Sequence, residues 1–288
     1  MARNTRSGRY AVNSYLHRWR QHLGALSVAV LFSGCGACLS AAAQAQADPV
    51  GGAERSTWLM YFGDHPVSEK VSVHLEGQYR RQGLGQRWEQ LLVRPGASYK
   101  FSEHLSVLLA YTYLRGYPFE GGSLGDVTTT GPQPEHRALE ELKISHKAFG
   151  SGEKAVKISH RLRAEQRFEG TSTAGVGVTD WEFGERARYR LTADVPFRWK
   201  TTGKLPDYTS LYHEVFVNFG PHGGSDALDR DRTYGAIGWN LDRDFQLEVG
   251  YLYQYQPIPN GIVNVHSHAL QVTIQSTAPL KRVFGKKK

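Results

Sequence analysis

The chain has 288 residues, a formal net charge of +8 and 40% hydrophobic residues, enough for one domain of ordinary size. No stretch of 18 consecutive apolar residues follows the first fifty positions, which excludes a protein that crosses a membrane with helices. Five arginines and no acidic residue precede Asp48, so the remaining chain has 30 basic and 27 acidic residues. The basic composition therefore does not indicate a nucleic-acid partner.

The first 47 residues have the three parts of a secretory signal. An Arg-bearing region precedes the apolar segment 23–32 (LGALSVAVLF), and the small-residue tract AAAQAQA follows. Ala45 and Ala47 both satisfy the small-x-small rule for cleavage, and lipidation at Cys35 is an alternative. Because Cys38 is the only other cysteine, the exported chain would contain neither disulfides nor cysteine metal ligands. We expect a cleaved signal peptide at 1–47, a short linker at 48–55, a single β-barrel domain at 56–278 and a basic tail at 279–288.

Polar and apolar side chains alternate along the segments that follow, most clearly in 155–168 (AVKISHRLRAEQRF). A period of two predicts a strand with two different faces, whereas a helix would scatter the basic residues around its circumference. A soluble sandwich strand is the alternative, but the predicted strands exceed the usual five or six residues and suit a tilted bilayer crossing. Ten are predicted, at about 71–81, 87–100, 105–117, 136–149, 155–168, 182–197, 208–219, 230–241, 245–256 and 263–275.

The connections between the predicted strands alternate in length, as in outer-membrane barrels with short periplasmic turns and longer outer loops. The ten strands are expected to close an antiparallel barrel with both ends on the periplasmic side. The aromatic segment 57–62 then enters the lumen, lies at the periplasmic rim or belongs to a twelve-stranded barrel. The sequence thus predicts an all-β, antiparallel transmembrane β-barrel of about 10 to 12 strands. Short links at 102–104, 150–154 and 242–244 alternate with longer ones at 118–135, 169–181, 220–229 and 257–262, and 198–207 departs from this rule.

Each predicted strand has an apolar face and an ionic face. The apolar face, as at Val71, Val73 and Leu75, is expected to contact lipid, with aromatic residues near the strand ends. The ionic face offers 14 basic and six acidic residues, and the planar arginine side chain binds carboxylates well. We predict a lumen charge network of Glu141, Lys143, Arg161, Arg163, Glu165, Arg167, Arg186, Arg188, Arg190, Glu214, Arg232 and Glu248.

This network has two interpretations. Ladders of Arg and Glu fill and close a narrow structural barrel, or they line a pore for small polar or anionic solutes, as basic rings do in anion pores. In either case the expected location is the bacterial outer membrane. The expected partners are outer-membrane lipids and lipopolysaccharide, the barrel-insertion machinery and, for a pore, small anions, and no cofactor is predicted.

Two other function classes are open alternatives. One is lipid modification by a Ser and His pair, for which His266, Ser267 and His268 are the candidates. The strand period places both histidines toward lipid and Ser267 toward the lumen, so they are not expected to form a nucleophile and base pair. The other is an envelope-anchoring or interaction role, suggested only by the basic tail and segment 57–62. No phosphate-binding Gly loop, H-E-x-x-H or G-x-S-x-G motif occurs, and we expect no enzymatic activity and no metal site.

Several strand motifs resemble those of a bacterial family of predicted outer-membrane β-barrels whose only name is a domain of unknown function. The segments are HRLRAEQRF (160–168), RARYRLTADVPF (186–197), YHEVFVNF (212–219), DRDRTYGAIGW (229–239) and LEVGYLYQYQ (247–256). The resemblance covers about residues 50–277 and implies an outer-membrane barrel without an established activity. His213 and Asp231 stand where the family has Asn. The matching residues are Arg161, Arg163, Glu165, Arg167, Arg188, Tyr189, Glu214, Phe216, Asn218, Arg232, Gly250 and Tyr251, and Glu141 with Lys143 resembles a preceding Glu-x-Arg.

Overall fold

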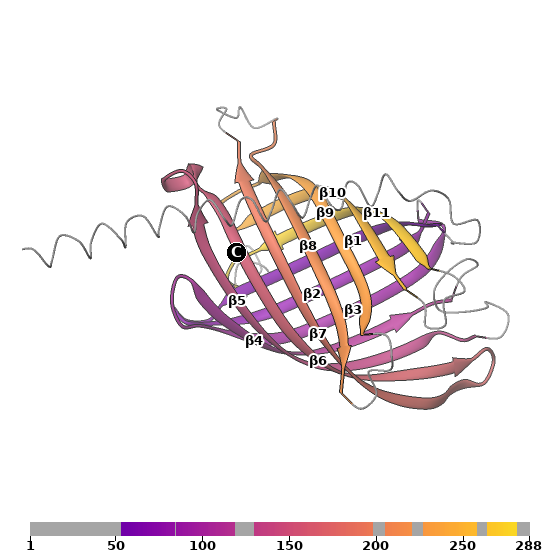
Figure 1. Cartoon of the computed structure of the whole chain (residues 1–288). Helices are drawn as coiled ribbons and strands as arrows, with labels where there is room; N and C mark the ends of the chain where they lie inside the picture. The colour runs from indigo at the N-terminus through magenta and orange to yellow at the C-terminus, as the bar shows by residue number, and fades with distance from the viewer. Residues whose placement is uncertain are drawn as a thin grey trace, which may run out of the picture. The chain divides into compact units, whose positions relative to one another are not determined.

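The computed structural model describes residues 53–83, 85–118, 130–197, 205–220, 227–257 and 264–280. These residues form a closed β-barrel of eleven strands (Figure 1). The predicted signal peptide, with Cys35, Ala45 and Ala47, and most of the predicted linker and basic tail lie outside the described residues. Within the described ranges no helix has the length and apolar character needed to cross a membrane.

The all-β class and the barrel predicted from the sequence are confirmed, with a strand number inside the predicted range. All ten of the long predicted segments are strands, and most of their bounds agree with the prediction to within two residues. The strands are β1 (Ala53–Pro66), β2 (Val71–Gln82), β3 (Arg87–Lys100), β4 (Leu105–Gly116), β5 (Gln133–Ala148), β6 (Val156–Thr173), β7 (Gly177–Pro196), β8 (Tyr208–Phe219), β9 (Leu228–Asn240), β10 (Phe245–Gln256) and β11 (Val265–Ser276).

Segment 57–62 is part of β1, which closes the barrel between β2 and β11. Leu59 lies opposite Tyr79 in the antiparallel pair with β2 and opposite Val272 in a parallel pair with β11. The prediction that ten strands close an entirely antiparallel barrel is therefore wrong. With an odd number of strands and antiparallel pairing between all consecutive ones, the first and last strand must run parallel.

The stretch 169–181, predicted as a long loop, is also mostly strand. The ladder of β6 and β7 continues through it, and the chain reverses over only three residues, 174–176. Gly175 and Gly177 adopt positive φ angles of 76° and 101°, which residues with side chains rarely accept. The outer part of this hairpin carries Thr, Ser, Asp and Glu rather than alternating apolar residues, so its sequence resembles a loop. It extends beyond the neighbouring strands (Figure 1).

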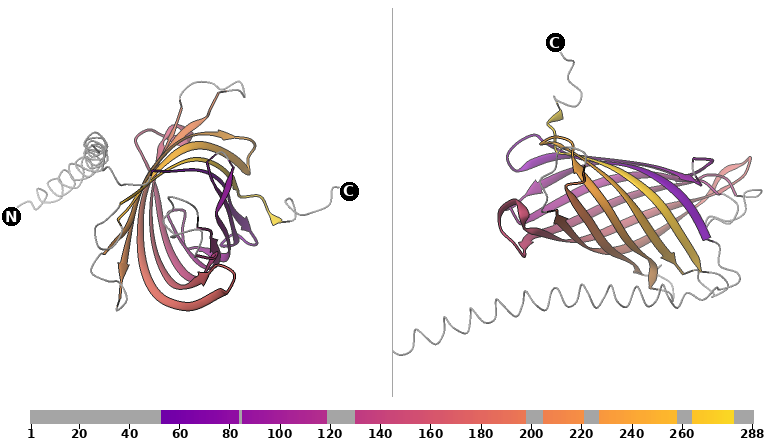
Figure 2. Two further views of the ribbon diagram at one scale, coloured as in Figure 1. Left: turned by 90° about the vertical axis from the view of Figure 1, so that its right-hand side faces the viewer. Right: turned by 90° about the horizontal axis from the view of Figure 1, so that it is seen from above.

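The connections divide the barrel into two ends. The left view in Figure 2 shows the strands wrapped around one interior. We call the end with connections 67–70, 101–104 and 241–244 the turn end; it also carries the 3₁₀ helix η1 (Gly152–Lys154). The opposite end, the loop end, carries the connections from β4 to β5, β8 to β9 and β10 to β11, and β1 begins there.

Side chains alternate between the lumen and the outer surface along every strand. Large apolar side chains lie outside, with Leu109 62% exposed and Tyr251 53% exposed, whereas Glu165 and Glu214 are fully buried inside. One cluster of buried apolar residues lies in the lumen on the side of β1 and β8 to β11. Its buried residues are Trp58, Met60, Tyr212, Tyr234, Ala236, Leu252 and Ala269.

We expect Trp58→Ala to lower the free energy of unfolding by roughly 3–5 kcal/mol, the usual cost of removing a large buried side chain. Trp58 is 2% exposed, its indole nitrogen donates to both carboxylate oxygens of Glu89 at 3.1 Å, and Arg80 stacks on its ring. The measurement is urea unfolding of the barrel folded in detergent. Leu59→Ala, on the outward face of the same strand, is the matched control and should cost clearly less. Equal losses would contradict the lumen position of Trp58.

Candidate functional site: the arginine and glutamate network of the lumen

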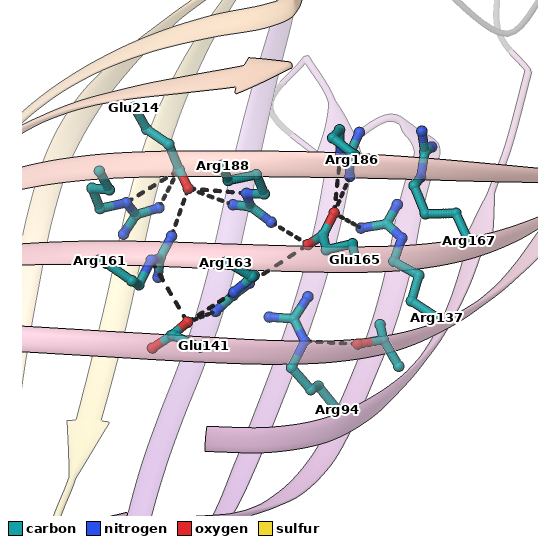
Figure 3. Close-up of polar contacts among 12 residues, drawn as sticks. Arg94, Arg137, Glu141, Arg161, Arg163, Glu165, Arg167, Arg186, Arg188 and Glu214 are labelled. Carbon is teal, nitrogen blue, oxygen red and sulfur yellow. Dashed lines mark hydrogen bonds and ion pairs between the residues drawn. The ribbon is translucent and has the colours of Figure 1, made fainter. Parts of the chain in front are cut away.

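The register of β5 to β8 places like charges directly opposite each other on the inward face. Arg163 pairs with Arg188 across β6 and β7, as Arg161 does with Arg190. Directly opposed like charges destabilise a sheet, and buried charges require partners. Carboxylates from the neighbouring strands supply them, and Figure 3 shows the resulting network.

Glu214 on β8 is the first centre of this network and binds three arginines. Its Oε1 accepts hydrogen bonds from Arg161 Nη2 at 2.7 Å and from Nε and Nη2 of Arg188 at 3.0 and 2.8 Å. Its Oε2 accepts from Nε and Nη2 of Arg190 at 3.1 and 2.6 Å. One carboxylate thus receives five charge-assisted hydrogen bonds, the strongest kind of hydrogen bond in proteins, while three positive charges surround it.

Glu165 on β6 is the second centre. Its Oε2 accepts from Nε and Nη2 of Arg186 at 3.0 and 2.6 Å, and its Oε1 accepts from Arg188 Nη1 at 2.7 Å. The Nη1 atoms of Arg163 and Arg137 lie 3.8 and 3.9 Å from the carboxylate. Arg188 therefore joins the two centres, because its guanidinium donates to both carboxylates.

Two carboxylates of β5 extend the network. Glu141 Oε2 accepts from Nε and Nη2 of Arg163 at 2.8 and 2.5 Å. Toward the loop end, Glu135 Oε1 accepts from Nε of Arg137 at 2.5 Å and from Nε of Arg167 at 2.7 Å. All of these groups are largely buried, so removing a single partner would leave a charge with neither water nor a counter-ion.

Aromatic rings cover several of the arginines. The guanidinium carbons of Arg188 and Arg232 lie 4.2 and 4.7 Å from the ring centre of Phe216, which is almost fully buried. The guanidinium of Arg190 lies 3.9 Å from the ring centre of Tyr212. Cation–π contacts of this kind strengthen when water is excluded, so the rings stabilise positive charge that the carboxylates do not fully neutralise.

A cavity of about 530 Å³ lies inside the barrel. The network lines part of the wall, with Arg161, Arg163, Arg188 and Arg190, and residues of β1 to β4 and β8 to β11 line the rest. Gly152 and Glu153 of η1 also line the cavity, so it reaches the turn end. Its walls are rich in charged side chains of both signs, because carboxylates such as Glu141, Asp194 and Glu248 line it together with the basic residues.

The chain matches a protein-family model described as "Protein of unknown function (DUF2490)" over residues 55–265. The chain belongs to this family. The matched range runs from β1 to the first residue of β11, and the predicted resemblance to a family of unknown function is thereby confirmed. No curated protein and no solved structure matches the chain. The family model covers most of the barrel, and its description names no activity.

The DUF2490 barrel joins nine of the twelve predicted network residues through ion pairs. The other three have no ion pair with another described residue. Arg232 donates to Gln254 at 2.6 Å, Glu248 accepts from the hydroxyl of Tyr208 at 3.1 Å, and Lys143 lines the cavity. The nine are Glu141, Arg161, Arg163, Glu165, Arg167, Arg186, Arg188, Arg190 and Glu214.

Sequence reasoning missed several residues that complete this DUF2490 network. Glu135 lies one residue before the predicted start of its strand, and Asp229, which accepts from Arg186 at 2.9 Å, also lies just outside a predicted strand. Trp58 belongs to the segment that had no place in the predicted barrel. Phe216 was noted only as a match to the family motif, although its spacing of two from Glu214 places both on one face.

The candidate residues for lipid hydrolysis lie on opposite faces of β11. Ser267 faces the lumen and donates to Glu54 at 2.8 Å, and both are buried. His266 and His268 face outward, and the Nδ1 of His266 is hydrogen-bonded to the hydroxyl of Tyr253 at 2.7 Å. Ser267 therefore does not pair with either histidine. Within the described part of the chain, no group of three or more His, Cys, Asp or Glu side chains is placed to hold a metal ion.

We expect Glu214→Gln to lower the free energy of unfolding by roughly 3–5 kcal/mol, because three arginines lose their shared counter-charge in a buried site. Thermal and urea unfolding of the folded barrel measure the change. Glu140→Gln is the matched control, since Glu140 is exposed on the outer face and accepts one hydrogen bond from Gln166. An unchanged stability of Glu214→Gln would mean that water or ions already neutralise these arginines.

Proposed function

We propose that this protein is an outer-membrane β-barrel whose lumen is closed by the arginine and glutamate network. The observation that carries the proposal is the inverted distribution of side chains: ion pairs fill the interior, and large apolar side chains cover the outside. Leu109, Leu162 and Leu211 are about half exposed or more on the outer face. A chain in water rarely exposes extended apolar surface, whereas a transmembrane barrel presents an apolar band to lipid.

Aromatic residues at both ends support the same proposal. Phe101 and Phe149 are exposed just beyond β3 and β5 at the turn end, and Trp88, Trp181 and Phe219 are exposed toward the loop end. Aromatic rings gather at the two membrane interfaces of transmembrane barrels. From this location follow export by the predicted signal, insertion by the barrel-insertion machinery and contact with outer-membrane lipids and lipopolysaccharide.

The packing of the lumen favours a closed barrel over an open pore. Glu165 and Glu214 are fully buried, and Arg163 and Arg188 are nearly so although both also line the internal cavity. This burial supports a lumen that side chains close at the level of the two glutamates. Barrels with few strands have an interior that side chains can fill. The network therefore replaces the hydrophobic core of a soluble protein, because the apolar side chains face outward.

We expect the folded wild-type protein to give no discrete conductance steps in a planar bilayer. Arg188→Ala should introduce brief steps, since it removes the side chain that joins Glu165 to Glu214 and stacks on Phe216. Leu162→Ala, which alters only the outer face, is the control and should remain silent. Steps with a reversal potential favouring anions in the wild-type protein would overturn closure and make the lumen a pathway.

The membrane location needs its own test. In cells, the protein should fractionate with the outer membrane, and its migration on gels should change on heating, as for other stable barrels. Fractionation with the periplasm, or migration that heating does not change, would overturn the location.

A further inference from the structure

We propose that Arg80 and Arg232 form a binding site for a small carboxylate inside the lumen. Arg80 projects from β2 and Arg232 from β9, and both side chains line the internal cavity. Their guanidinium carbons lie 3.7 and 5.4 Å from the ring centre of Trp58. The barrel thus brings two cations from separate walls beside one indole, and we call these three residues the Trp58 site. The inference goes beyond the proposed function and does not depend on the membrane location.

These two arginines differ from the other buried arginines in their partners. Eight arginines in the described ranges are buried. Arg80 and Arg232, which are 6% and 7% exposed, form no ion pair within 4.0 Å with any described residue. A buried cation without a counter-ion is costly, so the Trp58 site lacks a negative charge. The six buried arginines that form ion pairs are Arg94, Arg137, Arg163, Arg167, Arg186 and Arg188.

Most N–H groups of the two guanidinium groups have no acceptor among the described residues. Arg80 Nη2 donates to the side-chain oxygen of Gln78 at 2.6 Å, and Arg232 Nε donates to that of Gln254 at 2.6 Å. The Nε of Arg80 is buried and has no hydrogen-bond partner in the described part of the chain. Each guanidinium has five N–H donors. A carboxylate would supply acceptors for these donors together with the missing charge.

Two carboxylates lie close to the Trp58 site, and both have other partners. Glu89 accepts from the indole nitrogen of the site at 3.1 Å and forms no ion pair within 4.0 Å with a described residue. Glu214 lies opposite Arg232 in the register, but its oxygens accept five hydrogen bonds from three other arginines. Arg230 lines the same cavity and is paired with Asp229 at 2.7 Å. Glu89 can therefore balance at most one of the two charges.

Apolar side chains and one amide complete the surroundings of the site. Leu92 and Leu114 lie opposite each other on β3 and β4 and line the cavity. Gln90 also lines it, opposite Arg80 in the register, and its side-chain amide forms no hydrogen bond with a described residue. This combination suits a carboxylate that carries a small apolar body, such as benzoate.

The cavity gives such a ligand both room and access. Its volume of about 530 Å³ lies within the usual range for small-molecule sites. The same cavity is lined by Gly152 and Glu153 of η1 at the turn end. A small carboxylate can therefore reach the two arginines from that end.

The test is isothermal titration calorimetry of benzoate with the folded barrel in detergent, for the wild-type protein, Arg80→Met and Arg232→Met. We expect each variant to bind benzoate at least about tenfold more weakly, since one of the two cations is lost. Benzamide has nearly the same shape without the charge and should not compete. Benzoate should raise the thermal midpoint of the wild-type protein and leave that of both variants nearly unchanged.

The matched control is Arg81→Met. Arg81 follows Arg80 on β2, faces outward and donates to the backbone oxygen of Gly85 at 3.1 Å. The control should bind benzoate like the wild-type protein. An equal loss of binding in Arg81→Met, equal binding of benzamide, or displacement of benzoate by an equal concentration of chloride would overturn the carboxylate site.

Stability without ligand separates this site from a purely structural role. Because Arg80 has no counter-ion, Arg80→Met should leave the thermal midpoint unchanged or raise it, whereas Glu214→Gln lowers it. A fall as large as that of Glu214→Gln would mean that neighbouring groups already neutralise Arg80, and would overturn the inference. Heat-modifiable migration first shows that each sample is folded. Conductance and cell fractionation test the proposed function without added ligand, so the two proposals can fail separately.

Discussion

The structure depends on the pairing of buried carboxylates with several arginines each. A carboxylate such as Glu214 or Glu165 would be costly to bury alone, and so would each arginine around it. Arg188 donates to both carboxylates, so each centre fixes the geometry of the other. Networks of this kind stabilise one arrangement when every member is satisfied and are unfavourable when one is missing. The inward-facing side chains therefore adopt one well-defined packing arrangement, even though few of them are apolar.

This constraint explains why β1 has to be part of the wall. Trp58 of β1 offers its indole nitrogen to Glu89 of β3 and its ring to Arg80 of β2, so polar contacts continue across the closing strand. On the other side of β2, Arg94 pairs with Glu76 and donates to Thr112 at 2.7 Å. Without β1 the barrel would have two edges whose backbone N–H and C=O groups lack partners, and such edges invite pairing with other chains.

The sequence predicted the parts of this structure that a period of two can reveal. It placed the long strands and the inward face of β5 to β8 because charged and apolar residues alternate there without interruption. It missed the closing role of β1, since the pairing of first and last strands is a long-range property that no local pattern encodes. It also missed the outer β6–β7 hairpin, where Thr171 and Asp180 pair across a polar ladder without an apolar face. Which carboxylate binds each arginine depends on the register between neighbouring strands, and this register is known only from the structure.

The two ends of the lumen differ in how their charged side chains are paired. Toward the loop end, Arg137 and Arg167 share Glu135, and Arg167 also pairs with Glu169. Toward the turn end, lysines oppose each other, and only Asp194 faces Lys157 across the ladder. Glu153 and Glu248 also line the cavity at this end. The lumen therefore combines a tightly paired network of arginines and glutamates, in the middle and at the loop end, with exposed lysines at the turn end.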